Sequence, residues 1–134
     1  CLSRGLGDVY KRQDLNSYNE IANIVKNAEM YDNSIAIAMY DKEDKDANLI
    51  CAKAADELLT ISDITASFVL GNVGDKVCIS GRSIGDVNVQ LILEKLGGGG
   101  HITLAGAQVE GMTLEEVKQE LINRINEYFS EIAN

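Results

Sequence analysis

The residues best able to do chemistry in this 134-residue chain form one stretch, Gly97-Gly98-Gly99-Gly100-His101, which contains the only histidine. Glycine has no Cβ, so this backbone can adopt positive φ angles and bring its N–H groups close to a ligand. If a helix begins near His101, its free N–H groups and positive dipole end favour an anion such as phosphate there. A glycine run can equally be a flexible linker, but this one lies between strongly patterned segments and has no polar spacer residues. Gly97 is also the expected glycine just past a helix end, so the binding hypothesis concerns mainly 98–100.

A second group of polar residues falls on the predicted strand 76–82. Alternation along a strand places Ser80 and Arg82 on one face, where a covered strand should be apolar. Either Arg82 marks the solvated end of the strand, or it lines a polar pocket with Ser80 and Ser83. In such a pocket the guanidinium would bind phosphate or carboxylate through two parallel hydrogen bonds. Asn88, in the first turn of the next predicted helix, points either to solvent or to the same pocket.

Composition limits the class of protein. The chain is 46% hydrophobic and 25% charged, which is typical of one globular domain. Its 21 acidic and 12 basic residues give a net charge of −9, which argues against binding to duplex DNA or to an anionic membrane surface. No run of about 18 apolar residues predicts a membrane span. The three cysteines have no metal-ligand spacing, and they are interpreted as small buried residues of a cytoplasmic protein.

The hydrophobic pattern predicts the elements that must position these residues. Helices are expected at 14–31, 47–60 and 87–96, with a last helix after a Thr113–Glu116 capping box; strands are expected at 34–40, 64–70 and 76–82, with a short extended stretch at 108–110. Strand 34–40 is apolar on both faces, so it needs helices on both sides. A five-residue turn, 71–75, joins the next two strands into an antiparallel hairpin. The fold class expected is α/β, a single domain with a small mixed sheet of about four or five strands flanked by helices on both faces.

Local patterns also suggest how the chain is divided. Residues 1–13 match nothing that follows and are interpreted as a non-native cloning or assembly scar, without the pattern of a signal peptide. Residues 14–31 are expected to be a linker helix leading into a domain at 32–134. The charged stretch 41–46 is expected to be a solvated loop, in which Asp46 caps the following helix and Asp86 caps the helix at 87–96. We expect the chain to be the end of a longer protein.

The motifs together resemble the DHH-associated domain, the C-terminal half of the DHH phosphoesterase superfamily. The residues that carry this resemblance are Ile79-Ser80-Gly81-Arg82-Ser83, Asn88-Val89-Gln90, Gly97-Gly98-Gly99-Gly100-His101 and Ala105-Gly106-Ala107. Three further segments look most like the membrane-bound cyclic di-AMP phosphodiesterases: 54–59, 66–69 and 88–91. One departure is Gly81, where many relatives have alanine; because only a methyl group is missing, we expect little change.

The resemblance implies a binding role for this chain. In the family, the DHH half holds two metal ions, usually manganese, which activate water for in-line attack on a phosphodiester. The associated domain closes over that site and binds the nucleotide. The resemblance therefore implies that Arg82 binds a phosphate, and that the loop of Gly98, Gly99, Gly100 and His101 holds phosphate and nucleotide through backbone N–H groups and the imidazole. Ser80, Ser83 and Asn88 would add supporting polar contacts.

What the sequence lacks sets the expected limits of its activity. It contains no DHH motif, and one histidine cannot build a two-metal site. We therefore expect no metal bound by this chain, no hydrolysis by it alone, and two manganese ions in a DHH domain of the same parent protein. The expected ligand is a cyclic dinucleotide or short oligonucleotide, and the expected location is the cytoplasm or the cytoplasmic end of a membrane-anchored parent, without direct membrane contact. The alternatives are the substrate-binding half of a nanoRNA or pAp phosphatase, a non-catalytic nucleotide-binding module, and a structural domain in which His101 only caps a helix.

Overall fold

The computed structural model describes residues 15–133, so the interpretation of 1–13 and of Cys1 concerns residues outside the described range. The helices are α2 (Leu15–Lys26), α3 (Ala47–Leu58), α4 (Val89–Glu94) and α5 (Leu114–Ala133). The strands are β1 (Glu29–Tyr31), β2 (Ile35–Tyr40), β3 (Ala66–Val73), β4 (Lys76–Ser83), β5 (Gly99–Gly100) and β6 (Leu104–Glu110). No helix in this part of the chain is long and apolar enough to cross a membrane.

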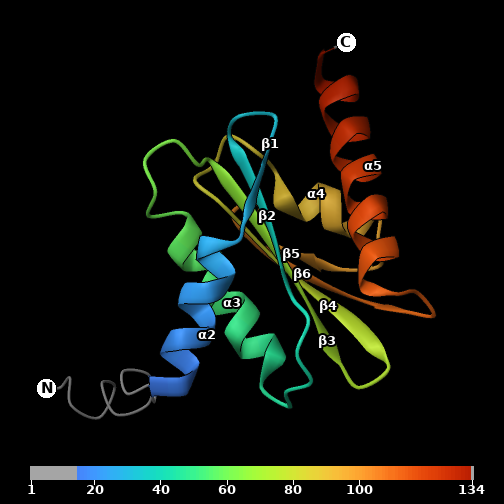
Figure 1. Ribbon diagram of the computed structural model, residues 1–134. Helices are drawn as coiled ribbons and strands as arrows, with labels where there is room; N and C mark the ends of the chain where they lie inside the picture. The colour runs from blue at the N-terminus through green and yellow to red at the C-terminus, as the bar shows by residue number, and fades with distance from the viewer. Residues whose placement is uncertain (1–14, 134) are drawn as a thin grey trace, which may run out of the picture.

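The strands form one mixed sheet in the order β1-β2-β3-β4-β6-β5. Only β2 and β3 pair in parallel among these strands, and the other neighbours are antiparallel. Helices α2 and α3 lie on one face of the sheet, and α4 and α5 lie on the other (Figure 1). The predicted α/β class with helices on both faces is therefore confirmed. The sheet has six strands rather than the four or five expected. The two additional strands, β1 and β5, are only three and two residues long, which is too short for a recognisable strand pattern.

The first predicted helix is shorter than expected. It ends at Lys26, and residues 29–31, which were expected to continue it, form β1 at the edge of the sheet. Asp32 and Asn33 both have positive φ angles, 57° and 66°, which is the geometry of a tight hairpin turn. The chain therefore folds back into β2 instead of extending the helix.

The predicted hairpin is confirmed, but its turn is tighter. Strand β3 continues to Val73 and β4 begins at Lys76, so the five-residue turn expected at 71–75 is reduced to Gly74-Asp75. Gly74 has a φ of 63°, a conformation that glycine adopts without strain.

Helix α4 differs most from the prediction. A helix over 87–96 capped by Asp86 was expected, but α4 has only six residues and Asn88 caps it. The Asn88 side chain accepts a hydrogen bond from Leu91 N at 3.0 Å. Val87 lies before the helix, where its side chain is buried in the core and its carbonyl accepts a hydrogen bond from Ser83 Oγ.

The helix expected near His101 does not form. Residues 101–103 connect β5 to β6, and β6 begins at Leu104, earlier than the extended stretch expected at 108–110. The prediction of a helix dipole facing the glycines is therefore wrong. The glycine run instead becomes an edge strand.

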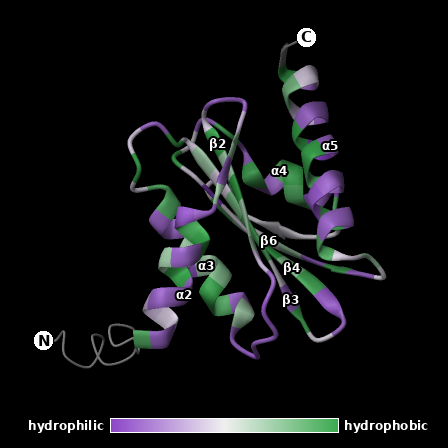
Figure 2. Ribbon diagram, viewed as in Figure 1, coloured by the Kyte–Doolittle hydropathy of each residue, from purple (hydrophilic) through white to green (hydrophobic). Residues whose placement is uncertain are grey.

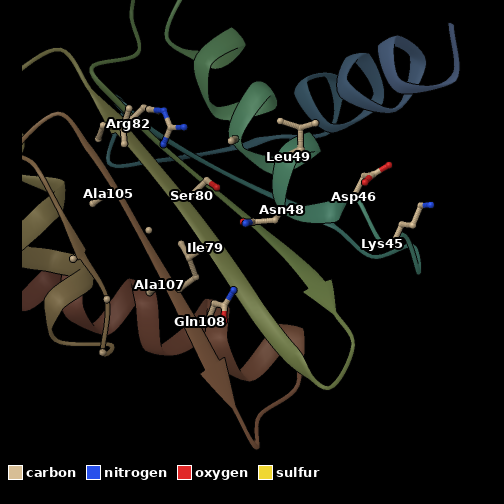
Figure 3. Close-up of a pocket in the computed structure, with 16 residues that line it drawn as sticks. Lys45, Asp46, Asn48, Leu49, Ile79, Ser80, Arg82, Ala105, Ala107 and Gln108 are labelled. Carbon is tan, nitrogen blue, oxygen red and sulfur yellow. The ribbon is translucent and has the colours of Figure 1, made fainter. Parts of the chain in front are cut away.

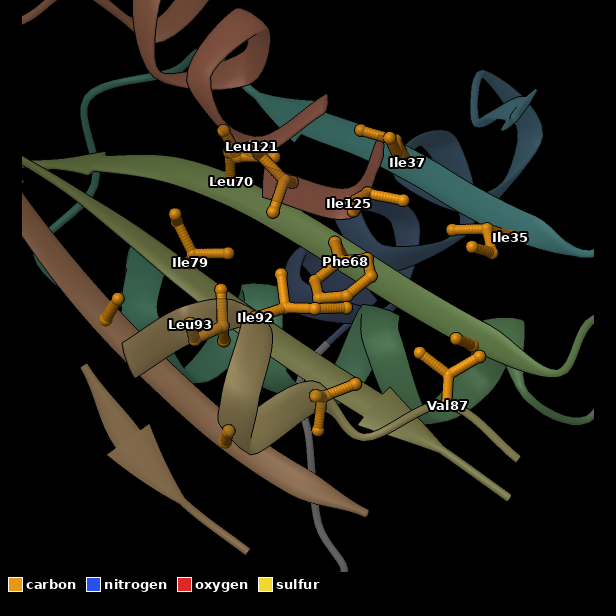
Figure 4. Packing of buried hydrophobic residues seen from close by; sticks show 14 of the residues in the cluster. Ile35, Ile37, Phe68, Leu70, Ile79, Val87, Ile92, Leu93, Leu121 and Ile125 are labelled. Carbon is orange, nitrogen blue, oxygen red and sulfur yellow. The ribbon is translucent and has the colours of Figure 1, made fainter. Parts of the chain in front are cut away.

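The sheet separates two hydrophobic cores, as the alternation along β4 predicts. Ile79 faces α4 and α5, where it packs in the cluster of Phe68, Leu93 and Leu121 (Figure 4). Figure 2 shows α5 as alternating hydrophobic and hydrophilic stretches, as expected for a helix with one face on the sheet. A Cβ at Gly81 would lie 3.1 Å from Leu93 and Phe68 carbons, so alanine there requires these side chains to shift slightly.

The second core lies beneath α2 and α3. Cys51 and Cys78 are buried there and free, as predicted. A hydrogen bond to Cys78, together with burial, raises the pKa of the Cys51 thiol. The predicted capping box is also confirmed: Thr113 Oγ1 accepts from Glu116 N at 3.2 Å, and Glu116 Oε1 accepts from Thr113 N at 2.9 Å.

Candidate functional site

A cleft of about 840 Å³ lies between α3 and the β4–β6–β5 side of the sheet (Figure 3). It exists because α3 packs on β2, β3 and β4, so the sheet extends past this helix toward β6 and β5. The cleft is lined by strands β4 and β6, by the first glycines of the 97–100 run, and by α3 with the loop before it.

Strand register gives the cleft a floor with little side-chain bulk. Ser80 pairs with Gly106 across β4 and β6, and Gly106 pairs with Gly99 across β6 and β5. Residues directly opposite in antiparallel strands share a face of the sheet. Three small residues in a row therefore form the floor, with Arg82 and Leu104 as the next pair on the same face.

Arg82 is held firmly at one end of the cleft. Its side chain is only 12% exposed, so it does not mark a solvated strand end. Its Nε donates to Asp56 Oδ1 at 2.8 Å, and its Nη1 donates to the Gly81 carbonyl at 2.9 Å. These contacts fix the planar guanidinium and leave Nη2 for a ligand. A pre-positioned guanidinium of this kind is suited to binding phosphate.

Ser80 supplies an unpaired polar group beside Arg82. The residue is 5% exposed, and its hydroxyl makes no hydrogen bond with any other described residue. Between residues 15 and 133 only Arg124 Nε is a buried side-chain N or O atom without a partner, so the Ser80 hydroxyl is in contact with solvent. The hydroxyl faces the cleft, so a ligand or water there would satisfy it.

The glycines hold the edge strand against β6. Gly97 has a φ of 87° and follows α4, as predicted. A Cβ at Gly98 would lie 2.1 Å from the Gly106 carbonyl oxygen, and one at Gly100 would lie 2.4 Å from the Leu104 carbonyl oxygen. Gly98 and Gly99 line the cleft. Gly98 N already donates to the Leu93 carbonyl at 2.9 Å, so its N–H is not free for a phosphate.

The structure places the remaining predicted residues outside the cleft lining. Gly100 ends β5. His101 follows it in the connection to β6, where it is exposed and its N–H donates to the Leu104 carbonyl at 2.7 Å. Ser83 Oγ donates to the Val87 carbonyl at 2.7 Å and orders the loop before α4. Asn88 caps α4. The ligand contacts expected of these four residues stay predictions.

The cleft also contains residues that the sequence did not single out. They come from α3 and the loop before it and from the end of β6: Lys45, Asp46, Asn48, Leu49, Ala52 and Gln108. Four of them are spaced as on one face of a helix, at positions 45, 48, 49 and 52. This spacing could have indicated from the sequence that they line one surface. Gln108 could be found only from its register opposite Cys78.

Local charge in the cleft differs from that of the whole chain. Its lining has two cations, Lys45 and Arg82, against one carboxylate, Asp46, and Arg82 is paired with the Asp56 carboxylate next to the cleft; the whole chain has a net charge of −9. The loop before α3 is ordered by Asp44 rather than by the expected cap, because Asp46 makes no capping side-chain bond. Asp44 accepts hydrogen bonds from Asp46 N and from Tyr40 Oη, both at 2.8 Å, which lower the pKa of the Asp44 carboxyl.

The described residues do not suit a metal centre. Between residues 15 and 133 there is no group of three His, Cys, Asp or Glu side chains that could hold one ion. The sequence resemblance assigns the two metal ions to a DHH domain and not to this part of the chain. The groups that the cleft presents to a ligand are instead the guanidinium of Arg82 and the hydroxyl of Ser80.

Replacing the α4 cap tests how the loop beside the site is held. Asn88→Ala is expected to lower the free energy of unfolding by about 1 kcal/mol, because the Leu91 N–H loses its acceptor. Urea unfolding measures this loss. Asn19→Ala, at an exposed position in α2, is the control and should change stability by less than about 0.5 kcal/mol. Equal stability of the two variants would contradict the capping role.

Comparison with known proteins gives a consistent family. The DHHA1 domain model matches residues 32–131. Cyclic-di-AMP phosphodiesterase GdpP of Geobacillus thermodenitrificans is 44% identical over 119 residues, which are 88% of this chain and 18% of that protein. Cyclic-di-AMP phosphodiesterase PdeA of Listeria monocytogenes is 36% identical over 121 residues, 90% of this chain and 18% of that protein.

A solved structure agrees with the fold. An exopolyphosphatase-related protein from Bacteroides fragilis superposes with a TM-score of 0.80 at 19% identity, covering 96% of this chain and 39% of that one. This chain thus spans about a fifth of the length of the curated relatives it matches. The match to the family model over most of the chain, and the relatives at 36–44% identity, lead to one conclusion: the chain belongs to the DHHA1 domain family.

Proposed function

We propose that this chain is the nucleotide-binding part of a phosphodiesterase that hydrolyses cyclic di-AMP to pApA. The observation that carries the proposal is the cleft in which the anchored Arg82 guanidinium lies beside the unpaired hydroxyl of Ser80. The names of the relatives at 36–44% identity support cyclic di-AMP as the ligand.

The contacts available define how a phosphate would bind. Arg82 offers Nη2 as a charged donor, and Ser80 offers a hydroxyl that can donate or accept. The row of Gly99 and Gly106 leaves the floor open beside them. Because the N–H groups of Gly98 and His101 are already used, the side chains of Arg82 and Ser80 carry most of the phosphate binding.

The hydrolytic step belongs to another part of the parent protein under this proposal. A DHH domain would supply two manganese ions and the attacking water, and this chain would hold the nucleotide against them. The chain alone would be inactive, and the parent would act in the cytoplasm. Any manganese-dependent turnover of cyclic di-AMP by the isolated chain would contradict this division of roles.

Calorimetric titration with cyclic di-AMP, pApA and AMP tests the proposal. We expect cyclic di-AMP to bind most tightly, with Arg82→Ala weaker than the wild type. His101→Ala tests whether the imidazole, which lies outside the cleft lining, contacts the nucleotide. Lys42→Ala is the control, because Lys42 is exposed and pairs with Glu20 away from the cleft lining. Tighter binding of pApA would indicate a linear substrate, as in a nanoRNA or pAp phosphatase. Failure of all three ligands to bind would contradict the proposal for the isolated chain.

A further inference from the structure

We infer that the end of the cleft opposite Arg82 is a subsite for an adenine base, formed by the side-chain amides of Asn48 and Gln108. The inference rests on the proposed function, because it takes a phosphate at Arg82 as its reference point. Under this inference the half of the cleft away from Arg82 contacts the base of the nucleotide.

The register of β4 and β6 sets the length of the cleft. Arg82 pairs with Leu104, whereas Gln108 pairs with Cys78, four residues away along β4. At about 3.4 Å per residue, these two levels are about 14 Å apart. A lone phosphate at Arg82 would leave the Gln108 end empty, whereas a nucleotide extends from its phosphate toward its base.

Two amides line the cleft from opposite walls, both beyond Ser80 when viewed from Arg82, and Asn48 lies between Ser80 and Gln108. Asn48 comes from the first turn of α3, and Gln108 comes from β6 (Figure 3). Neither side chain makes a hydrogen bond to another residue in the described range. Both amides are therefore free to contact a ligand that fills the space between them.

The chemistry of the amides favours adenine. Each amide has a donor NH₂ and an acceptor oxygen, and adenine presents the matching acceptor N7 and donor N6 on one edge, which Asn and Gln pair with through two hydrogen bonds. Leu49, 56% exposed beside Asn48, offers an apolar surface to the base.

The middle of the cleft suits the sugar that joins phosphate and base. On the sheet side it has Gly106, opposite Ser80, and on the helix side it has Ala52. Neither residue carries a side chain longer than a methyl group. The cleft therefore has the Arg82 guanidinium at one end, a middle without long side chains, and two amides at the other end, where Lys45 and Asp46 carry opposite charges.

Titration of the whole chain with AMP, ribose 5-phosphate and inosine 5′-monophosphate tests this subsite. AMP should bind about tenfold more tightly than ribose 5-phosphate, which lacks the base. The double variant Asn48→Ala/Gln108→Ala should weaken AMP binding about tenfold, leave ribose 5-phosphate unchanged, and abolish any preference for AMP over the inosine nucleotide. Gln119→Ala, an exposed amide on α5 across the sheet, should change none of these values.

The outcomes separate the subsite from the proposed function. If Arg82→Ala weakens both AMP and ribose 5-phosphate but the amide variant leaves their ratio unchanged, the base subsite is wrong and the phosphate site stands. If neither ligand binds the wild type, the base subsite and the proposed phosphate site are both wrong. Side-chain amide resonances give an independent check: those of Asn48 and Gln108 should shift with AMP and not with ribose 5-phosphate, and a shift with both ligands alike would overturn the inference.

Discussion

Replacing Arg82 by alanine is expected to weaken binding of AMP and cyclic di-AMP by about 100-fold. A hydrogen bond to a charged group contributes about 1.5–3 kcal/mol, and each tenfold in affinity corresponds to about 1.4 kcal/mol. The Asp56 and Gly81 contacts hold the guanidinium in place before a ligand arrives, so little ordering is required on binding. Arg82→Lys keeps the positive charge but loses the planar guanidinium. Its affinity should lie between those of the wild type and Arg82→Ala, about tenfold weaker than the wild type. Calorimetry at fixed salt measures all three proteins.

The fold should survive this substitution, which keeps the binding result interpretable. The ion pair joins Arg82 to an Asp56 side chain that is 64% exposed, and pairs with an exposed partner contribute about 0–1 kcal/mol. Arg82→Ala should therefore melt within a few degrees of the wild type. Wild-type affinity in a folded Arg82→Ala protein would show that the phosphate does not bind at this end of the cleft.

The part of the site that could be predicted from the sequence is the part set by local alternation. Ser80 and Arg82 share a face because they are two residues apart in a strand, and the structure places both in the cleft. A six-residue apolar strand with no polar face, β2, likewise predicted helices on both sides of the sheet. These features depend only on residues close in the chain.

The predictions that were wrong concern features that depend on pairing between distant segments of the chain. The glycine run carries no side-chain pattern, so its role as an edge strand follows only from its partner β6. The small residues of β6 likewise gave no sign that the strand begins at Leu104. Gln108 and Asn48 meet in one cleft although 60 positions separate their numbers in the sequence. No local rule brings such residues together; the register of β4 with β6 does.

The hairpin turn at Asp32-Asn33 shows a different limit of predicting helices from the spacing of apolar residues. Apolar spacing continued past Lys26 and suggested a longer helix, but two adjacent residues in the left-handed region reverse the chain. Asn and Asp tolerate that conformation better than other non-glycine residues. An Asp-Asn pair before an apolar strand is thus a turn signal that outweighs helical periodicity.

Gly98→Ala is expected to destabilise the chain by about 3 kcal/mol, whereas Gly99→Ala should leave its stability within about 0.5 kcal/mol of the wild type. A Cβ at Gly98 would lie 2.1 Å from the Gly106 carbonyl oxygen and 2.8 Å from the Ala107 Cα. Both atoms belong to the β6 backbone, so the edge strand itself would have to move. A Cβ at Gly99 meets nothing within 4 Å. Thermal and urea unfolding of the two variants measure the difference.

The same pair of variants separates a structural role of the glycines from a binding role. Gly99 shares the cleft face with Gly106, so the added methyl of Gly99→Ala would stand on the floor of the cleft, on the far side of Gly106 from Ser80. This variant should therefore fold normally and still bind AMP several-fold more weakly than the wild type. Full affinity in Gly99→Ala would mean that the ligand does not reach the glycine strand, and wild-type stability of Gly98→Ala would mean that β5 is not held against β6 as closely as the structure shows. Loss of affinity without loss of stability at Gly99, and loss of stability at Gly98, would assign one glycine to the ligand and its neighbour to the sheet.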